Sequence, residues 1–272
     1  MTLSSIGMRR ITKAVIPAAG KGTRLLPLTK AVPKELVPLG RKPVLEHIVE
    51  EAVCSGITDI LFVISEEKKA IQKHFGDSAD GVRFYYTFQA EQKGLADAIY
   101  CGKEFVGKDP FAVVLGDSIV DTDQAILPFR RVLDTYQNTN AKGVIVVQKT
   151  PLCEVSRYGI VKPKYDIAPS FEIDALIEKP KLEDAPSEYA IAGRYAFSPI
   201  IFDYIDKTPR GAVGEYQITD SIGLMLKDNN EVWCVALGEN EIRRDIGTFE
   251  SYYEAFQIEI NKEKADSSLR SE

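Results

Sequence analysis

A loop of small residues, Ala18-Ala19-Gly20-Lys21-Gly22-Thr23-Arg24, follows the first apolar segment of the chain. Small side chains let backbone N–H groups approach a phosphate or the edge of a base. The glycine spacing is wrong for a Walker P-loop, and Leu25 stands where a Rossmann dinucleotide fingerprint has its third glycine. We therefore expect a different kind of anion- or base-binding loop, and the plain alternative for its glycines is a tight turn.

Cationic side chains continue directly after this loop. Arg24 precedes, and Lys30 and Lys34 lie within, the segment Pro27–Pro38, whose prolines exclude a continuous helix. Each cation alone is typical of a solvated surface charge. Together, on a loop that rigid elements position, they can converge on one bound anion.

Two carboxylates are candidates for work at the same site. Asp117 follows the apolar run Phe111–Leu115, at the carboxyl end of a predicted strand, where ligands bind in open α/β sheets. Asp245, in the sequence RRDIG, lies far along the chain and can approach Asp117 if the second half folds over the first. The plain alternative for Asp117 is a turn or helix-cap aspartate.

Further candidates lie in the second half of the chain. Glu178 and Lys179 follow the short apolar segment Ala175–Ile177, and their plain alternative is an exposed ion pair. Gly159 and Gly193 permit a ligand to approach the backbone closely, although either could be an ordinary bulge glycine.

The elements that must position these residues alternate between strands and helices. We predict apolar strands at 13–19, 59–64, 82–88, 111–115 and 143–147, and helices at 44–55, after Ser65 and at 95–105. This alternation indicates βαβ units and a mixed, mainly parallel central sheet flanked by helices. Proline-bearing loops then separate short strands at 159–162, 175–178 and 189–197, which predicts a β-rich second half. Helices at 219–228 and 249–262 and a strand at 232–237 complete the pattern.

Composition narrows the class of protein. The 272 residues carry 34 Lys+Arg and 40 Asp+Glu, a net charge of −6 and a pI near 5.2, which argues against binding to nucleic acid or an anionic membrane. The four cysteines lie far apart, without a CxxC pair or zinc-ligand spacing. No apolar region follows the basic residues of the N-terminus, so we expect a cytoplasmic protein.

An ordered set of motifs resembles the sugar nucleotidyltransferases, and most closely the bacterial UTP–glucose-1-phosphate uridylyltransferases. The set is Gly20–Arg24, Pro33-Lys34-Glu35, Arg157–Val161, Glu178-Lys179-Pro180, Gly193-Arg194-Tyr195, Gln217–Asp220 and Asp245-Ile246-Gly247. The resemblance implies an α/β, Rossmann-like nucleotidyltransferase fold whose β-rich second half binds the sugar. Because no linker separates the two halves of the chain, we expect one domain over residues 11–262, with an extension at 1–10 and a frayed tail at 263–272.

The resemblance also implies roles for the candidate residues. Arg24, Lys34 and Lys179 are the expected catalytic cations, the first two on the triphosphate of UTP and the third on the phosphate of glucose 1-phosphate. Asp117 and Asp245 are expected to hold Mg²⁺. The expected nucleotide contacts are Ala19, Gly20, Gly22, Thr23, Glu35, Gln89 and Gly94, and the expected sugar-phosphate contacts are Asp117, Gly159, Glu178, Lys179 and Gly193. The implied reaction gives UDP-glucose and pyrophosphate, in a homo-oligomer.

Two alternatives remain open at this point. The Gly-Leu-Gly-His-Ala that is usual in the uridylyltransferases stands here as Gly94-Leu95-Ala96-Asp97-Ala98, which is more similar to thymidylyltransferases. The alternative activity is therefore transfer from dTTP, or to another sugar phosphate. The alternative class is a non-catalytic sensor of nucleotide sugars that has kept the pocket.

Overall fold

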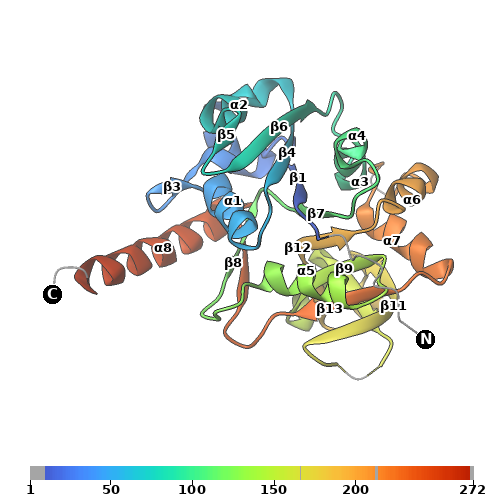
Figure 1. Ribbon diagram of the computed structural model, residues 1–272. Helices are drawn as coiled ribbons and strands as arrows, with labels where there is room; N and C mark the ends of the chain where they lie inside the picture. The colour runs from blue at the N-terminus through green and yellow to red at the C-terminus, as the bar shows by residue number, and fades with distance from the viewer. Residues whose placement is uncertain (1–9, 166, 212–213, 270–272) are drawn as a thin grey trace, which may run out of the picture.

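A ten-stranded mixed β-sheet forms the middle layer of the protein, with helices on both faces (Figure 1). The structure is a computed structural model and describes residues 10–165, 167–211 and 214–269. Its sheet strands are β1 (Lys13–Pro17), β4 (Asp59–Ile64), β5 (Ser78–Ala79), β6 (Val82–Phe88), β7 (Phe111–Val114), β9 (Gly143–Lys149), β10 (Gly159–Pro163), β11 (Ser170–Glu178), β12 (Tyr189–Phe197) and β13 (Val232–Ala236). They are ordered β10-β11-β13-β9-β12-β7-β1-β4-β6-β5.

The first half of the chain builds a parallel block within this sheet. Strand β1 lies between β4 and β7, and β4 pairs with β6, all in parallel. Both β4 and β6 have the predicted bounds, and every residue of β4 is buried. Because parallel strands end at the same edge, the glycine loop after β1, Ser65 after β4, Gln89 after β6 and Asp117 after β7 lie along one edge of the sheet.

Successive residues of the strands face two separate hydrophobic cores. Ala14 and Ile16 of β1 belong to one core, whereas Val15 between them belongs to the other. Helices α1 (Val44–Cys54), α2 (Lys69–Phe75) and α5 (Pro128–Asn138) cover the first face. Helices α3 (Leu95–Tyr100), α4 (Lys103–Val106), α6 (Ile201–Lys207) and α7 (Ile218–Lys227) cover the second. The predicted α/β fold with a sheet covered on both faces is confirmed.

The second half of the chain pairs mostly antiparallel. Strand β12 lies antiparallel to both β7 and β9, and β11 lies antiparallel to both β10 and β13. The pair β9–β13 is parallel. Mainly parallel pairing therefore holds for the first half, while the β-rich second half extends the same sheet rather than forming a separate one.

A single predicted helix at 95–105 is divided into α3 and α4. The break falls at Cys101-Gly102, where a Cβ on Gly102 would lie 2.9 Å from Val15 Cγ2 of β1. The missing side chain lets this turn lie close against the sheet, so packing rather than helix propensity ends α3.

Two small antiparallel pairs lie outside the main sheet. They are β2 (Pro38–Leu39) with β3 (Lys42–Pro43), and β8 (Ser118–Asp121) with β14 (Ile242–Asp245). Neither pair was predicted. The second pair joins the segment after β7 to a segment more than 120 positions later, and so ties the end of the chain to the first half.

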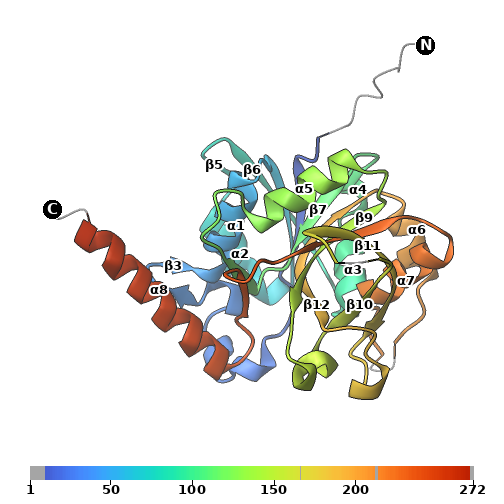
Figure 2. The ribbon, with the colours of Figure 1, turned by 90° about the horizontal axis from the view of Figure 1, so that it is seen from below.

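Helix α8 (Phe249–Leu269) extends away from the sheet beyond β2 and β3 (Figures 1 and 2). The Tyr252 hydroxyl donates to the Pro38 carbonyl (2.8 Å), and Arg41 forms an ion pair with Glu263 (3.3 Å). The helix continues seven residues beyond the predicted end at Lys262, so the expected frayed tail is helical as far as Leu269. Most of the expected N-terminal extension lies outside the described residues. Among the helices of the described ranges, none has the length and apolar character needed to cross a bilayer.

Candidate active site

The glycine loop after β1 is folded around the side chain of Lys34. Gly22 has a φ of +66°, a left-handed conformation that glycine adopts without strain. The Thr29 hydroxyl donates to the Gly22 carbonyl (3.0 Å), which holds the loop against the following segment. A Cβ on Gly20 would lie 3.7 Å from Lys34 Nζ. The structure thus brings the predicted loop and the predicted cation together.

Lys34 forms an ion pair with Asp117 across the end of the sheet. Its Nζ lies 2.5 Å from Asp117 Oδ2, and its side chain is 13% exposed. Burial would raise the pKa of Asp117, but the charges of Lys34, Arg243 and Lys68 outweigh this effect and lower that pKa. Burial likewise opposes the charge of Lys34, but Asp117 and Glu35 raise its pKa. Both groups are therefore charged at neutral pH.

Glu35 lies beside Lys34 in sequence but faces the protein interior. Its side chain is 1% exposed and its carboxylate accepts hydrogen bonds from Lys68 Nζ at 2.7 and 2.8 Å. Lys68 Nζ also donates to the Ala18 carbonyl (2.9 Å), at the end of β1. Burial raises the pKa of Glu35 and lowers that of Lys68, against the attraction between them. The predicted nucleotide contact of Glu35 is thus corrected to an internal ion pair that fixes the base of the loop.

Lys68 is a site residue that sequence reasoning missed. The sequence does not distinguish Lys68 from the next residue, Lys69, because both are lysines. They differ in burial, since the side chain of Lys68 is 8% exposed and that of Lys69 is 59% exposed. Lys68 helps to line a pocket of about 340 Å³ between the glycine loop and Ser65. The other lysines of this pocket are Lys21, Lys30 and Lys34. With Glu67 as its single carboxylate, the pocket favours an anion.

The β8–β14 ladder places Asp245 beside Asp117. Asp245 is paired with Ser118 in this ladder, and the amide of Ile246 donates to the Asp117 carbonyl (2.8 Å). The predicted approach of these two distant segments is therefore confirmed at the level of the backbone. Arg24 joins them, because a Cβ on Gly247 would lie 3.1 Å from Arg24 Nη2.

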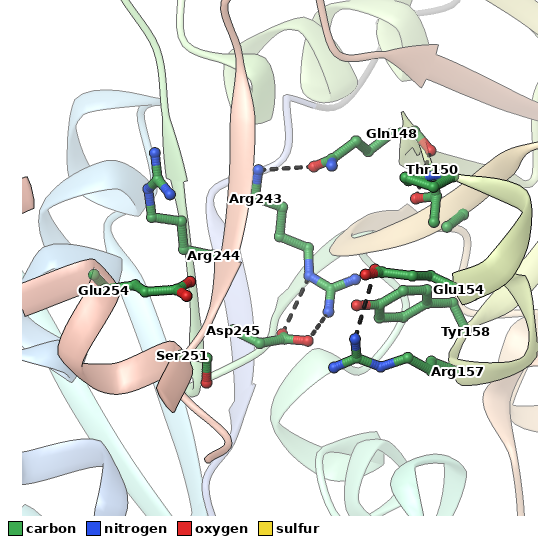
Figure 3. A pocket seen from close by; sticks show the side chains of 13 residues that line it. Gln148, Thr150, Glu154, Arg157, Tyr158, Arg243, Arg244, Asp245, Ser251 and Glu254 are labelled. Atoms are coloured by element: carbon green, nitrogen blue, oxygen red, sulfur yellow. Dashed lines mark hydrogen bonds and ion pairs between the residues drawn. The ribbon is translucent and has the colours of Figure 1, made fainter. Parts of the chain in front are cut away.

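Arg243 is a second site residue without an assignment from the sequence. Figure 3 shows its guanidinium between Asp245 and the ring of Tyr158. The guanidinium donates to both carboxylate oxygens of Asp245 and to the Ile191 carbonyl, and lies 4.7 Å from the Tyr158 ring centre. Arg243, Asp245 and Tyr158 border a pocket of about 240 Å³, which Arg157 and Glu154 also line. The run of three charged residues after Ile242 in IRRD carries no signal that distinguishes Arg243 from Arg244.

The sugar-binding candidates meet where β10 begins and β11 ends. Gly159 is paired with Glu178, and a Cβ on Gly159 would lie 3.1 Å from Glu178 Oε2. The Thr219 hydroxyl donates to that same oxygen (3.0 Å). Lys179 has a φ of +47°, and its half-exposed ammonium lies 3.5 Å from Glu178 Oε1. Glu178 is therefore oriented by its neighbours, while the ammonium of Lys179 is accessible from solvent.

Gly193 and Arg194 connect this region to Asp117. Gly193 has a φ of +76° and lies in the bulge of β12, where its carbonyl accepts from the Leu115 amide (3.0 Å). The fully buried Arg194 guanidinium donates to Glu51 and to the Ser118 carbonyl (2.9 Å). The buried Arg194 thus holds the segment that carries Asp117 at the end of β7.

Gln89 and Gly94 lie at the same edge of the sheet, after β6. Gln89 is 4% exposed, and its Nε2 donates to Asp97 Oδ2 (2.6 Å) and to the Gly94 carbonyl (3.4 Å). Gly94 has a φ of +115°, and a Cβ there would lie 2.5 Å from the Tyr216 carbonyl oxygen. Only glycine fits at position 94.

Asp117 and Asp245 have the chemistry of a magnesium site. Within the described ranges no group of three or more His, Cys, Asp or Glu side chains is arranged to hold a metal ion. Mg²⁺ however needs only one or two protein carboxylates when substrate phosphates and water complete its octahedron. Two such carboxylates lie here beside a loop with cationic side chains, and each is ion-paired with a cation of the chain, Lys34 or Arg243.

Comparisons of sequence find a matching family and named relatives. The profile of the family described as "Nucleotidyl transferase" matches residues 13–262. The chain is similar to UTP–glucose-1-phosphate uridylyltransferase 2 of Staphylococcus saprophyticus, at 42% identity over 79% of this chain and 81% of the relative. It is equally similar, at 42% identity, to UTP–glucose-1-phosphate uridylyltransferase of Staphylococcus epidermidis, over 88% of this chain and 89% of the relative.

Solved structures show the same fold. A UDP-glucose pyrophosphorylase complexed with UDP-glucose superimposes with a TM-score of 0.86 at 31% identity, over 93% of this chain and 99% of the other. UTP-bound UGPase from Acinetobacter baumannii gives 0.83 at 30% identity, over 91% and 92%. A putative glucose-1-phosphate thymidylyltransferase from Bacillus anthracis gives 0.79 at 29% identity, over 91% and 95%.

Proposed function

The chain belongs to the nucleotidyl transferase family, and from that premise we propose that it transfers the uridylyl group of UTP to glucose 1-phosphate. The products are UDP-glucose and pyrophosphate. The observation that carries this proposal is the Lys34–Asp117 ion pair at the end of β7. Pairing of β14 with β8 places Asp245 next to it. A pocket lined by lysines and a pair of aspartates thus lie at the same edge of the sheet. Such a site suits a reaction between two phosphates, because both reactants are anions.

The reaction brings two anions together. A phosphate oxygen of glucose 1-phosphate attacks the α-phosphorus of UTP in line, while the bond from that phosphorus to the oxygen bridging the α- and β-phosphates breaks and pyrophosphate leaves. At about 4 Å and an effective dielectric near 20, each pair of like charges repels by roughly 4 kcal/mol. The chain must therefore supply cations and alignment rather than a nucleophile of its own.

Arg24 and Lys34 serve the triphosphate in this proposal. Lys34 lies against Gly20, so an anion bound on the loop backbone meets its ammonium directly. Ala19, Gly20, Gly22 and Thr23 contribute backbone contacts to the phosphates and the nucleoside. Glu35 contributes indirectly, because it fixes Lys68 on the carbonyl of Ala18.

Asp117 and Asp245 would hold Mg²⁺. The ion supplies charge neutralisation and orients the reacting phosphate oxygens when it is bound. With the ion bound, Lys34 and Arg243 would be less tightly held by the two carboxylates and would be available to phosphate oxygens, while Arg243 would keep its contacts with the Ile191 carbonyl and the Tyr158 ring. The ion pairs seen here thus keep both cations and both carboxylates in place before substrates arrive.

The second half of the chain holds the sugar phosphate. Glu178, oriented by Thr219, accepts hydrogen bonds from sugar hydroxyls, and Lys179 contacts the phosphate. Gly159 and Gly193 keep the backbone open to the sugar ring. Gln89 and Gly94 contact the uracil base on the opposite side of the site.

We also propose a cytoplasmic location and a homo-oligomeric state. All four cysteines are free thiols and two of them are exposed, which suits a reducing compartment. The oligomeric state follows from the resemblance to the family, and light scattering after size exclusion measures it.

A matrix of nucleoside triphosphates against sugar 1-phosphates, scored by kcat/KM for pyrophosphate release, tests the activity. UTP with glucose 1-phosphate should be the best pair. The second candidate, transfer from dTTP, is favoured by Ala96-Asp97, and a tenfold or greater preference for dTTP would replace the proposal with it. Absence of pyrophosphate release with every pair would leave the nucleotide-sugar sensor.

A further inference from the structure

Asp97 holds the side-chain amide of Gln89 in one of its two possible orientations. Gln89 Nε2 donates one hydrogen to Asp97 Oδ2 (2.6 Å), and the Gly94 carbonyl accepts at 3.4 Å. A carboxylate and a carbonyl are both acceptors, so both favour the NH₂ end of the amide. A rotation of the amide by 180° would place Gln89 Oε1 against the Asp97 carboxylate, which is repulsive.

The oxygen of the same amide is left for a ligand. Among the described residues, Gln89 Oε1 accepts no hydrogen bond, although Gln89 is only 4% exposed. This oxygen is also absent from the fully buried polar atoms that lack a partner, so it keeps access to the space outside the protein. A nearly buried amide with one satisfied end and one open acceptor points to a donor on a bound molecule.

From this arrangement we propose that Asp97 is a positioning residue that makes the enzyme select bases with an imide N–H, uracil and thymine, over cytosine. The inference rests on the proposed function, in which Gln89 contacts the base. Uracil and thymine carry a hydrogen on N3, which Gln89 Oε1 can accept. Cytosine has a lone pair at N3, which an oxygen held in place by Asp97 repels.

The selection of the base depends on Asp97 having hydrogen-bond acceptors only. An aspartate offers only acceptors, whereas an asparagine offers one acceptor and one NH₂ group. With Asp97→Asn the partner amide can pair with Gln89 in either orientation, and the orientation that turns Nε2 toward cytosine N3 is no longer penalised. Asp97→Ala removes the partner altogether and leaves only the longer contact to the Gly94 carbonyl.

The test compares UTP with CTP as substrates of the full-length enzyme. For Asp97→Asn we expect the ratio of kcat/KM for UTP over CTP to fall by about tenfold or more, mainly because use of CTP rises. Asp97→Ala should give a smaller fall. Glu104→Gln removes an exposed carboxylate from the first turn of the neighbouring helix α4, without contact to Gln89, and should keep the wild-type ratio.

A purely structural role of Asp97 in the first turn of α3 would lower use of both nucleotides equally. A UTP-to-CTP ratio within twofold of wild type in both Asp97 variants would overturn the inference. The dissociation constants of UMP and CMP, measured by calorimetry, give the same ratio without turnover. If the wild type turned over no nucleotide, the proposed function would fail, while this binding ratio would still decide the role of Asp97.

Discussion

The amide of Ile246 donates a hydrogen bond to the carbonyl of Asp117, 2.8 Å away, so two segments that are far apart in the chain meet through their backbones. The contact continues the β8–β14 ladder by one residue beyond the Asp245–Ser118 pair. Backbone pairing, rather than a side-chain contact, therefore places Asp245 beside Asp117. Substitutions of either carboxylate can leave this scaffold intact.

Asp117→Asn and Asp245→Asn should each fold normally and lose about 10²–10³ in turnover. The amide keeps the shape of the carboxylate but loses the charge that holds a hard cation. The concentration of Mg²⁺ needed for half-maximal activity should rise in each variant. Steady-state rates across a Mg²⁺ titration measure both effects.

The double variant Asp117→Asn/Asp245→Asn separates one shared site from two independent ones. Residues that act through one ion are non-additive, so the double variant should be scarcely slower than either single variant. Asp184→Asn, in the exposed turn Leu182–Asp184, is the matched control and should keep wild-type rates. Near-wild-type activity of either site variant at limiting Mg²⁺ would return that aspartate to a purely structural role.

Lys179→Ala should impair use of glucose 1-phosphate by about 10²–10³ in kcat/KM and leave UTP binding nearly unchanged. The reason is that Lys179 neighbours Glu178 on the second half, away from the glycine loop. Lys181→Ala, exposed two residues later, serves as the control. Equal losses of affinity for both substrates, measured by calorimetry, would contradict this division of roles.

Glu35→Gln and Lys68→Met should each destabilise the fold by about 3–5 kcal/mol, which lowers Tm by roughly 10 °C, because each leaves an unpaired buried charge. The double variant should recover a large part of this loss, since no isolated charge remains. Thermal unfolding followed by circular dichroism measures these values. Lys69→Ala, at the exposed neighbour, should shift Tm by no more than about 2 °C. A double variant as unstable as the sum of both singles would exclude an ion pair.

Asp121 should contribute stability that is lost in acid. Burial would raise its pKa, but hydrogen bonds and charges from Lys262 and Arg244 lower it below its ordinary value of 3.8. Its folded pKa is thus below its unfolded pKa, so its contribution is complete above about pH 4 and disappears as the pH falls through the folded value. Asp121→Asn should cost about 1–2 kcal/mol at pH 7 and flatten the loss of stability below pH 4. Urea unfolding at a series of pH values checks this, and an unchanged acid slope would contradict it.

The order of elements was predictable from the sequence because apolar runs and their period report burial directly. Strands β4 and β6 have their predicted bounds, and α1 ends at Cys54, one residue before the predicted end at Ser55. The predicted helix at 95–105 was wrong in its extent, because a tertiary contact ends α3 early. The division of α3 from α4 depends on the approach of Gly102 to Val15, and neither residue reveals that distance in its local sequence.

Residue type and order by themselves determined the α/β class, the glycine loop, the membership of Lys34 and Asp245 in one set of motifs, and the place of Asp117 after an apolar strand. Only the tertiary structure decided which charges face the ligand and which face the core. Lys34 and Glu35 are neighbours in sequence. The buried carboxylate of Glu35 nevertheless pairs with Lys68, whereas the ammonium of Lys34 pairs with Asp117. The physical reason is that the pairing of charges depends on distance in space and on burial, and both arise only when strands far apart in the chain, such as β8 and β14, lie side by side.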